Sequence, residues 1–343
     1  MARELRSGES IVLYSRRRMG KSSLLTELAR RYQKECIFVY VDLYGMTNRN
    51  RFLEVFAKNM VEASFGRAEK LVSGLRELLK SVSFRFVSER GEIAVEFART
   101  EPTREEVDQI FDLPERIAAR KRKRVVVMFD EFQEASSLDG VSLIKIMRSR
   151  FQFQKGATYV FCGSKRHLLY QIFEEREGAF FRFARPMELG PIPTDEFEEF
   201  IVRKFSEAGG RISRENAKRI VEASGGYPYY VQQISHELFD ITKMPGSPQD
   251  VEMAIDATVE HQSPAYSVLW DSIKSRLQRK YLVALALEPQ VPHGLEFVTK
   301  YGLKSRSHVQ RVERQLEARG IVEKGQIVDT MFARWLIGLF RSS

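Results

Sequence analysis

The sequence predicts an α/β protein in which a parallel sheet is flanked by helices, followed by a helical region and a small C-terminal unit. Apolar, strand-like runs alternate with amphipathic helical segments between Ser10 and Ile192. One run, Val125–Phe129, is wholly apolar, which is typical of a strand covered on both faces. From Thr194 onward the periodicity changes to that of helices. Because strands separated by helices form βα units, we expect the sheet to be parallel.

The strands predicted for this first part are 10–14, 36–45, 125–129, 158–164 and a short one at 185–192. The helices expected between them lie at about 22–31, 49–65 and 140–150, and residues 67–80 form another amphipathic stretch. Thr103 and Glu106 have the spacing of a capping box, which predicts a helix that continues to about Lys121. Apolar and polar residues alternate over 83–97, which predicts a β-hairpin.

The remaining residues are predicted to form two helical parts. Three helical segments between 194 and 241 indicate a small helical lid, and residues 251–280 are helical as well. Ser305 is expected to cap a helix that ends before Gly320, ahead of a short hairpin and a closing apolar helix. This order is typical of a winged helix-turn-helix. The predicted domains are therefore 1–193 with its hairpin insertion, 194–250 as the lid, and 251–343 as linker helices and winged helix.

The composition excludes several classes of protein. The chain has 343 residues, of which 43% are hydrophobic and 29% charged, an ordinary balance for a soluble globular protein. No apolar run is long enough to span a bilayer, and residues 1–10 lack the core of a signal peptide, so we expect a cytoplasmic protein without a membrane partner. Cys36 and Cys162 lie in apolar runs and are interpreted as core thiols. The net charge of +9 is compatible with a nucleic acid or an anionic surface as partner, and such a charge is also common in proteins that only bind nucleotides.

The segment "YSRRRMGKSSLL" lies between a predicted strand and a predicted helix, which is the context of a phosphate-binding loop. The backbone N–H groups of Arg18, Met19, Gly20 and Lys21 can converge there on phosphate oxygens, beside the helix N-terminus that continues into Ser22 and Ser23. Lys21 would reach the β- and γ-phosphates, and the Ser22 hydroxyl would bind Mg²⁺. Serine stands at position 15 where such loops usually have glycine, and it tolerates positive φ less well, so we expect a distorted loop.

Asp130-Glu131 follows the apolar strand 125–129. An aspartate at this place can hold Mg²⁺ through water, and a following glutamate can orient or deprotonate an attacking water. By itself such a pair is more often a solvated strand end. Together with the phosphate loop, it predicts binding of ATP and Mg²⁺ and a P-loop NTPase fold.

Two further residues are candidates for the catalytic machinery. Ser164 ends the strand 158–164 and could touch the γ-phosphate or the lytic water, although an ordinary turn serine fits the same position. Arg185 precedes the last strand and could complete the transition state from the same chain or from a neighbouring subunit. A surface role for Arg185 is the alternative, and Arg182 is a nearby competitor.

The segment "SGGYPYY" is expected to form a tight turn between two helices of the lid, because its two glycines permit the turn and Pro228 suits a helix start. One interpretation is that this turn only ends one helix and starts the next. The other is that Tyr227 and Pro228 pack against the adenine base and link the bound nucleotide to the position of the lid.

At these residues the chain resembles the archaeal-type ATPase family, a branch of the AAA+/STAND class of P-loop ATPases, over nearly its whole length. "YSRRRMGKSSLL" and "VVVMFDEFQEA" are similar to its Walker A and Walker B motifs, and "FCGS" to its sensor 1 strand. "FARPMELGPI" is similar to its glycine-arginine segment, with Ala184 in place of the glycine and Arg185 at the arginine. "SGGYPYYVQQ" matches the glycine-proline turn, and the C-terminal segments look like its winged helix. The box that usually precedes the first strand is not matched.

The sequence leaves two functions open. The first is an ATP-driven switch in which Mg-ATP closes the lid and slow hydrolysis releases it. The second is a DNA-binding protein in which the nucleotide is regulatory or structural, with Arg306, Gln310, Arg311 and Arg314 on the helix that would enter a major groove. Glu313 and Glu317 are expected to weaken that basic face, so a contact with a protein partner or a second copy of the chain is the alternative.

Overall fold

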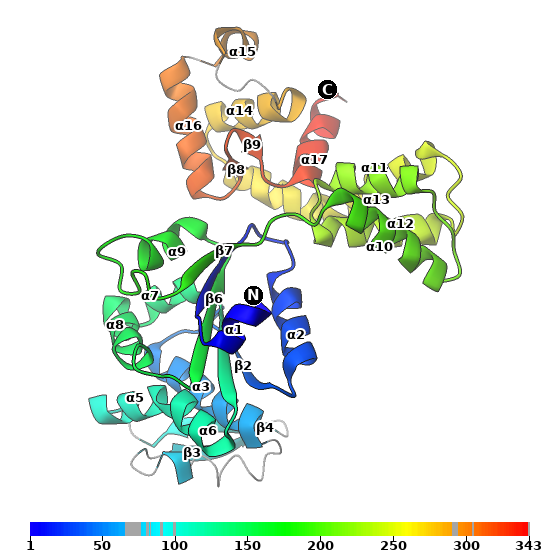
Figure 1. Ribbon diagram of the computed structural model, residues 1–343. Coiled ribbons are helices and arrows are strands. Elements are labelled where there is room, and N and C mark those ends of the chain that lie inside the picture. The colour runs from blue at the N-terminus through cyan, green and yellow to red at the C-terminus, as the bar shows by residue number, and fades with distance from the viewer. Residues whose placement is uncertain are drawn as a thin grey trace. The chain divides into compact units, whose positions relative to one another are not determined.

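The computed structural model describes residues 1–65, 77–79, 82, 84–89, 92–98, 101–289, 294–303 and 305–341. The chain forms two compact units, Met1–Gly190 and Pro191–Ser343 (Figure 1). Among the described residues, no helix combines the length and the apolar character needed to cross a bilayer. The finer division at 193 and 250 stays a prediction.

A five-stranded parallel sheet forms the centre of the first unit, with the strand order β2-β5-β6-β1-β7. Its strands are β1 (Ile11–Tyr14), β2 (Cys36–Asp42), β5 (Arg124–Asp130), β6 (Ala157–Gly163) and β7 (Arg185–Glu188). All five predicted strands are therefore present. The short β1 lies inside the sheet, which explains why all four of its residues are buried.

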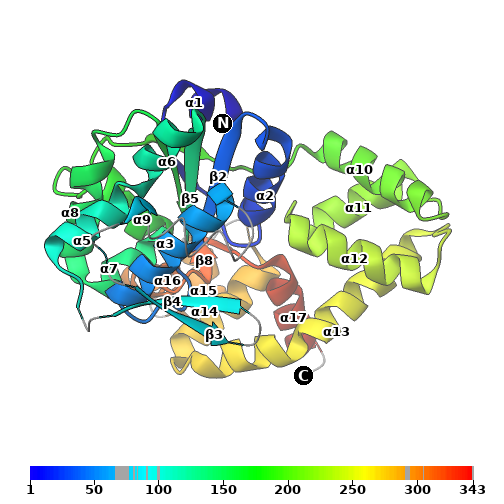
Figure 2. The same ribbon diagram turned by 90° about the horizontal axis from the view of Figure 1, so that it is seen from below.

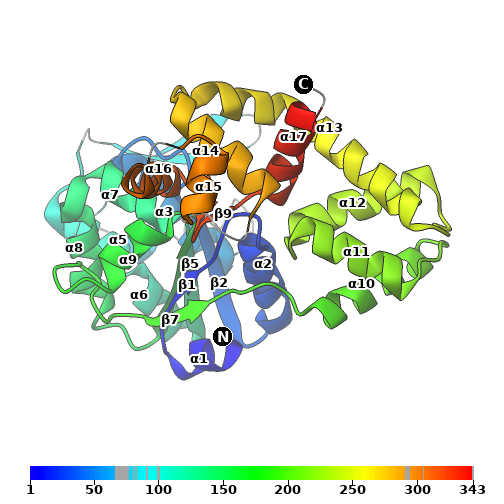
Figure 3. The same ribbon diagram turned by 90° about the horizontal axis from the view of Figure 1, so that it is seen from above.

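Helices cover both faces of this sheet (Figures 2 and 3). On one face lie α1 (Ala2–Ser7) and α2 (Lys21–Tyr32), whose Leu5 and Leu25 belong to the same core cluster as Leu13 of β1. The larger core on the other face contains Val12 of β1 and Val127 of β5. The helices on that side are α3 (Arg49–Phe65), α5 (Arg104–Phe111), α6 (Leu113–Lys121), α8 (Gly140–Phe151) and α9 (Arg166–Phe173). Alternation of side chains along each strand sends successive residues to the two cores.

The predicted hairpin is present as β3 (Phe84–Glu89) and β4 (Glu92–Phe97), which pair antiparallel outside the central sheet. It is attached to α3, because the backbone N–H of Phe97 donates to Glu54 Oε1 at 2.8 Å. Most of the amphipathic stretch expected at 67–80 lies outside the described residues.

The helix expected from Thr103 to Lys121 is instead two helices. Its start is as predicted, since Thr103 and Glu106 form both hydrogen bonds of a capping box. The chain breaks at Asp112, and Pro114 stands in the first turn of α6. Proline has no N–H to donate to the preceding turn, so a new helix begins there. Two short elements that the sequence pattern did not indicate, the 3₁₀ turn η1 (Phe132–Glu134) and α7 (Ala135–Leu138), follow β5.

The second unit begins with four helices: α10 (Thr194–Glu207), α11 (Arg214–Ser224), α12 (Pro228–Ile241) and α13 (Pro248–Ser272). The expected tight turn between α11 and α12 is present, with Gly225 at φ 63° and Gly226 at φ 73°. Pro228 is the first residue of α12, as predicted. The helical stretch expected at 251–280 is interrupted at Ile273, before α14 (Arg276–Leu287).

The rest of this unit comprises α15 (Leu295–Lys300), α16 (Arg306–Ala318), the β8–β9 pair (Val322–Glu323 and Gln326–Ile327) and α17 (Thr330–Arg341). Ser305 caps α16 through a hydrogen bond from the His308 N–H, as expected. The winged-helix interpretation itself stays a prediction. A buried network ties α12 and α13 to the start of α17, because the hydroxyls of Tyr230 and Tyr266 both donate to Asp329.

Candidate functional site

The candidate site lies at the carboxyl edge of the parallel sheet, where β1, β5 and β6 end (Figure 1). Tyr14, the last residue of β1, is in register with Gly163, and Asp42 is in register with Asp130. Because the strands are parallel, the loop after β1 and the polar residues after β5 and β6 emerge at the same edge. This shared edge brings the two predicted motifs together.

The loop between β1 and α2 turns at two residues with positive φ, Arg18 at 64° and Gly20 at 79°. Ser15 is not among the described residues with positive φ; it is buried, and its hydroxyl donates to the Arg16 carbonyl at 2.8 Å. The distortion expected from a serine at this position is therefore absent, because its backbone does not need the left-handed conformation. The strained residue of the loop is Arg18 instead.

The start of α2 has the features of an anion site. Gly20 is its N-cap, no side chain caps the helix, and the first turn contains no acidic residue. Lys21 is only 8% exposed, and its Nζ lies 3.5 Å from the Arg16 carbonyl. The Met19 side chain is buried, whereas Ser22 and Ser23 are exposed. The N–H groups of a helix N-terminus and a nearby ammonium group together attract phosphate.

Asp130 receives four hydrogen bonds at the end of β5. Its Oδ2 accepts from Ser22 Oγ at 2.9 Å and from the Tyr40 hydroxyl at 2.6 Å. Its Oδ1 accepts from the Glu131 N–H at 2.9 Å and from Cys162 Sγ at 3.3 Å. Burial works to raise the pKa of Asp130, but the hydrogen bonds from Tyr40, Cys162 and Ser22 outweigh it and hold the pKa below its usual value. The structure therefore keeps this buried carboxylate charged.

The oxygens of Ser22 and Asp130 suit a magnesium ion. Both are hard ligands, they come from the two motifs, and they lie within 2.9 Å of each other. In the described part of the chain, no group of three or more histidine, cysteine, aspartate and glutamate side chains could hold a metal. A hydroxyl, one carboxylate, water and substrate phosphates are the usual ligands of Mg²⁺ in nucleotide sites, so this donor set fits.

Glu131 is held by three donors on one oxygen. It adopts φ 49°, and its Oε2 accepts from Ser164 Oγ at 2.8 Å, from the Ser164 N–H at 3.1 Å and from Gln133 Nε2 at 2.5 Å. The structure thus brings Ser164 to Glu131, as the shared edge predicts.

Arg185 is not brought to this edge. It is the first residue of β7 and lies opposite Ile11, the first residue of β1. Three residues of strand, about 10 Å, separate it from the loop end. Its side chain is 55% exposed and pairs with Glu9 at 3.4 Å. Arg182 precedes β7, and its guanidinium carbon lies 5.1 Å from the Phe181 ring centroid. A role for Arg185 within its own subunit therefore has no support in the geometry.

Tyr227 and Pro228 belong to the second unit. The Tyr227 side chain is 5% exposed, and its ring lies 6.4 Å from that of Tyr230. Contact of these residues with an adenine base stays a prediction.

Sequence reasoning assigned no role at the site to Tyr40 or Gln133, and it interpreted Cys162 only as a core thiol. Tyr40 and Asp42 point to the same side of β2 because they are two residues apart. That spacing could have placed the tyrosine beside the acidic pair only if β2 had been known to lie next to β5.

Comparisons with known proteins were consistent with this geometry. The model of a family described as an ATPase domain predominantly from Archaea matches residues 3–234. A Walker-type ATPase of Pyrococcus abyssi is similar in structure, with a TM-score of 0.66 at 19% identity over 98% of this chain and 94% of that chain. The ORC2 protein of Aeropyrum pernix, in ADPNP and ADP complexes, has a TM-score of 0.58 at 13% identity, covering 100% and 93%. Comparison with curated protein sequences found no match.

Proposed function

Because the chain belongs to the family of ATPase domains found predominantly in Archaea, it is an ATP-binding protein with a P-loop NTPase fold, and we propose that it is a Mg²⁺-dependent ATPase that works as a nucleotide-driven switch. The proposal adds the metal, the residue roles and the switch to what the family establishes.

The observation that carries the proposal is the hydrogen bond between Ser22 and Asp130 at 2.9 Å. These residues are 108 positions apart in the chain and come from the two motifs. Their contact supports a single site in which the loop and the acidic pair face the same phosphates. When bound, Mg²⁺ would neutralise charge that develops on the phosphates in the transition state.

The side chains have separate roles in this proposal. The N–H groups of Arg18 to Lys21 and the Lys21 ammonium bind the phosphate oxygens, and Ser23 continues the helix start beside them. Ser22 and Asp130 hold the metal, directly and through water. Glu131 accepts a proton from the attacking water, and Ser164 orients Glu131 through the bonds described above.

In the proposed switch the helical lid, 194–250, moves when the nucleotide binds. Tyr227 and Pro228 contact the adenine base in this proposal. Hydrolysis is expected to be slow, because Arg185 lies away from the loop in its own unit and an arginine from a neighbouring subunit would be needed to speed it. A second copy of the chain is thus a proposed partner.

Two substitutions test the site. Lys21→Ala should abolish ATP binding, measured by calorimetry with Mg²⁺, since it removes the charge that meets the β- and γ-phosphates. Glu131→Gln should retain ATP but reduce turnover by ~10²–10⁴-fold, because an amide cannot take the proton. Lys34→Ala, at an exposed lysine beyond the end of α2, is the matched control. Unchanged ATP binding in Lys21→Ala would exclude the proposed site.

DNA binding remains a second candidate because one of the two acidic residues expected on the basic face of α16 is buried. Glu313 does not lie on the exposed face with Arg306, Arg311 and Arg314; it is 9% exposed, and its charge adds to burial in raising the pKa of Tyr281. Val309, Val312 and Leu316 are buried with it. Glu313 therefore lies on the buried stripe of the helix, and of the two acidic residues expected to weaken the basic face only Glu317 is exposed.

This candidate is tested by titrating duplex DNA at 50 and 200 mM salt, concentrations at which phosphate-driven binding differs by roughly 10³–10⁵-fold for 6–10 contacts. Arg311→Ala should weaken binding, whereas Arg319→Ala, beyond the end of α16, is the control. Binding that is independent of salt would count against DNA as the partner.

A further inference from the structure

Gln133 is a buried residue next to Glu131 whose function nothing above explains. It lies in the 3₁₀ turn η1 and is 3% exposed. Its neighbour Phe132 packs its ring against Phe161 and Phe180 in the core. The turn is thus anchored by Phe132, while the Gln133 carboxamide is directed at the candidate site.

The carboxamide donates to the same carboxylate oxygen that Ser164 binds. Gln133 Nε2 lies 2.5 Å from Glu131 Oε2 and 3.4 Å from Glu134 Oε1. Ser164 donates its N–H and its hydroxyl to Glu131 Oε2 as well. Within the described residues, none donates to Glu131 Oε1. A carboxylate held in this way has one oxygen occupied and one oxygen available to accept a proton.

Gly163 leaves the space that the Gln133 carboxamide occupies, because it has no Cβ atom. A Cβ atom at residue 163 would lie 1.9 Å from Gln133 Oε1, far closer than two atoms can approach. Gly163 is not at positive φ, so its backbone does not require glycine; only the space does. Gln133 Oε1 is buried and has no hydrogen-bond partner within the described residues. Such an atom is costly, and a buried polar group of this kind calls for an explanation.

The reversed amide would not remove this cost, because it would turn Gln133 Oε1 toward the Glu131 carboxylate and leave Nε2 against Gly163. In the observed orientation Gln133 Nε2 donates to Glu131, and Gln133 Oε1 is left without a donor within the described residues. Buried polar atoms without a hydrogen-bond partner occur at functional sites, where the cost in stability is accepted because the side chain must hold one particular orientation.

We propose that Gln133 is a positioning residue for hydrolysis, which, wedged against Gly163, holds Glu131 so that Oε1 alone faces the attacking water. This inference rests on the proposed role of Glu131 as the base. In this proposal Gly163 is required because a side chain there would occupy the space of the Gln133 carboxamide.

The first test replaces Gln133 by methionine, which has a similar length but no donor. The turnover number should fall roughly 10- to 100-fold, while the dissociation constant for ATP and the melting temperature stay unchanged. Gln171→Met, at an exposed glutamine of α9, is the matched control and should behave as the wild type. Wild-type turnover in Gln133→Met, or a parallel loss of ATP affinity and thermal stability, would overturn the proposal.

The second test uses the contact with Gly163 and does not depend on the behaviour of methionine. Gly163→Ala should lower turnover in the wild-type background, because the added Cβ displaces the carboxamide. In a Gln133→Ala background the same substitution has room and should change turnover less than twofold. Equal losses in both backgrounds would mean that the two residues act independently.

Glu131→Gln, measured in parallel, separates this inference from the proposed function. If Glu131→Gln hydrolyses ATP at the wild-type rate, Glu131 is not the base, and the role that the proposed function gives to Glu131 fails. If Glu131→Gln is inactive but Gln133→Met is fully active, only the positioning role fails.

Discussion

Polar and charged residues lie near both the carboxyl ends and the amino ends of the strands of the central sheet, but their contacts differ. At the carboxyl edge, Asp130 and Glu131 accept hydrogen bonds from tyrosine, serine, cysteine, glutamine and backbone groups. Neither carboxylate forms an ion pair with any described residue. Their negative charge is therefore oriented and not neutralised.

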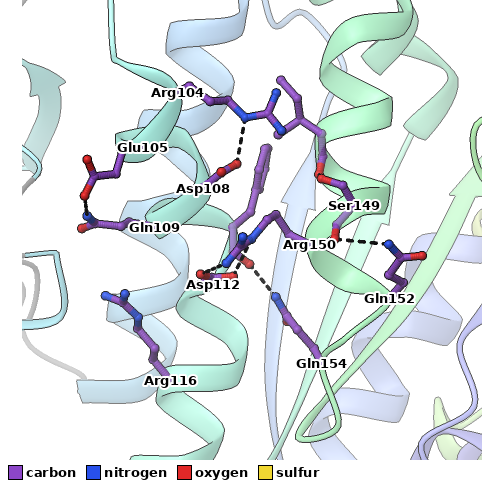
Figure 4. Close-up of polar contacts among 12 residues, drawn as sticks. Arg104, Glu105, Asp108, Gln109, Asp112, Arg116, Ser149, Arg150, Gln152 and Gln154 are labelled. Carbon is purple, nitrogen blue, oxygen red and sulfur yellow. Dashed lines mark hydrogen bonds and ion pairs between the residues drawn. The ribbon is translucent and has the colours of Figure 1, made fainter.

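Beside the segment that leads into β6, near the opposite edge, the charged side chains are neutralised by one another (Figure 4). Arg150, at the end of α8, forms two hydrogen bonds to the carboxylate of Asp112, which separates α5 from α6. Arg104 pairs with Asp108 at 3.0 Å. Gln154 Nε2 donates to the carbonyl of Phe111 at 2.8 Å. The bonds of Arg150 and Gln154 join α8 and the segment before β6 to the junction of α5 and α6, whereas the Arg104–Asp108 pair lies within α5.

The difference teaches how a site can be distinguished from a structural cluster. An ion pair leaves no charge for a ligand, whereas a carboxylate that is held by neutral donors keeps its charge for a cation or a proton. By this criterion Arg185, which pairs with Glu9, belongs with the structural cluster.

The largest effect in this comparison is expected from Tyr40→Phe, which removes one neutral donor from Asp130 and leaves the ring in place. The Mg²⁺ concentration needed for half-maximal ATPase activity should rise roughly tenfold, since partners of metal ligands typically contribute 10–100-fold. Tyr44→Phe is the control, because Tyr44 is 78% exposed. An unchanged Mg²⁺ requirement would show that Tyr40 does not orient Asp130.

The same variant should change how stability depends on pH. The pKa of Asp130 is lowered in the folded protein, so the carboxylate stabilises the fold above its unfolded pKa, and this stability is lost as the pH falls. Without the Tyr40 hydroxyl the pKa of Asp130 should rise. Urea unfolding should therefore show Tyr40→Phe to be less stable at pH 7, by about 1 kcal/mol, with the difference shrinking in acid.

A smaller effect, on stability alone, is expected at the other cluster. Arg150→Met removes the partner of Asp112 and should lower the free energy of unfolding by about 1 kcal/mol, since the pair is only partly buried. Thermal denaturation should show a melting temperature roughly 2–4 °C lower. The dissociation constant for ATP should not change; a change would mean that the two edges are coupled.

The smallest effect is expected for Arg185→Ala. Its side chain is exposed and lies away from the loop, so a dilute, monomeric preparation should hydrolyse ATP at the wild-type rate. The rate should also be measured at increasing protein concentration. If Arg185 acts on the site of a neighbouring subunit, the variant loses only the part of the ATPase rate that increases with protein concentration. A loss at all concentrations would contradict the position of Arg185.

The sequence by itself determined most of the helices and strands and the two motifs, although not the breaks at Asp112 and Ile273 or the short elements after β5. Local patterns predicted the strands β1, β5 and β6, the helix at about 22–31 and the cap at Ser305. The hydrogen bonds of a helix and the apolar runs of buried strands depend on residues close together in the chain. The position of Glu313 could also have been predicted, since it falls on the stripe of buried residues in α16.

Only the tertiary structure decided which side chains meet. The order β2-β5-β6-β1-β7 places Tyr40 beside Asp130, and the register of β7 with β1 places Arg185 at the far edge. The approach of Gln133 to Gly163 likewise joins the turn after β5 to the last residue of β6. Pairing between strands depends on contacts across long stretches of chain, and no local pattern records which neighbour a strand will have.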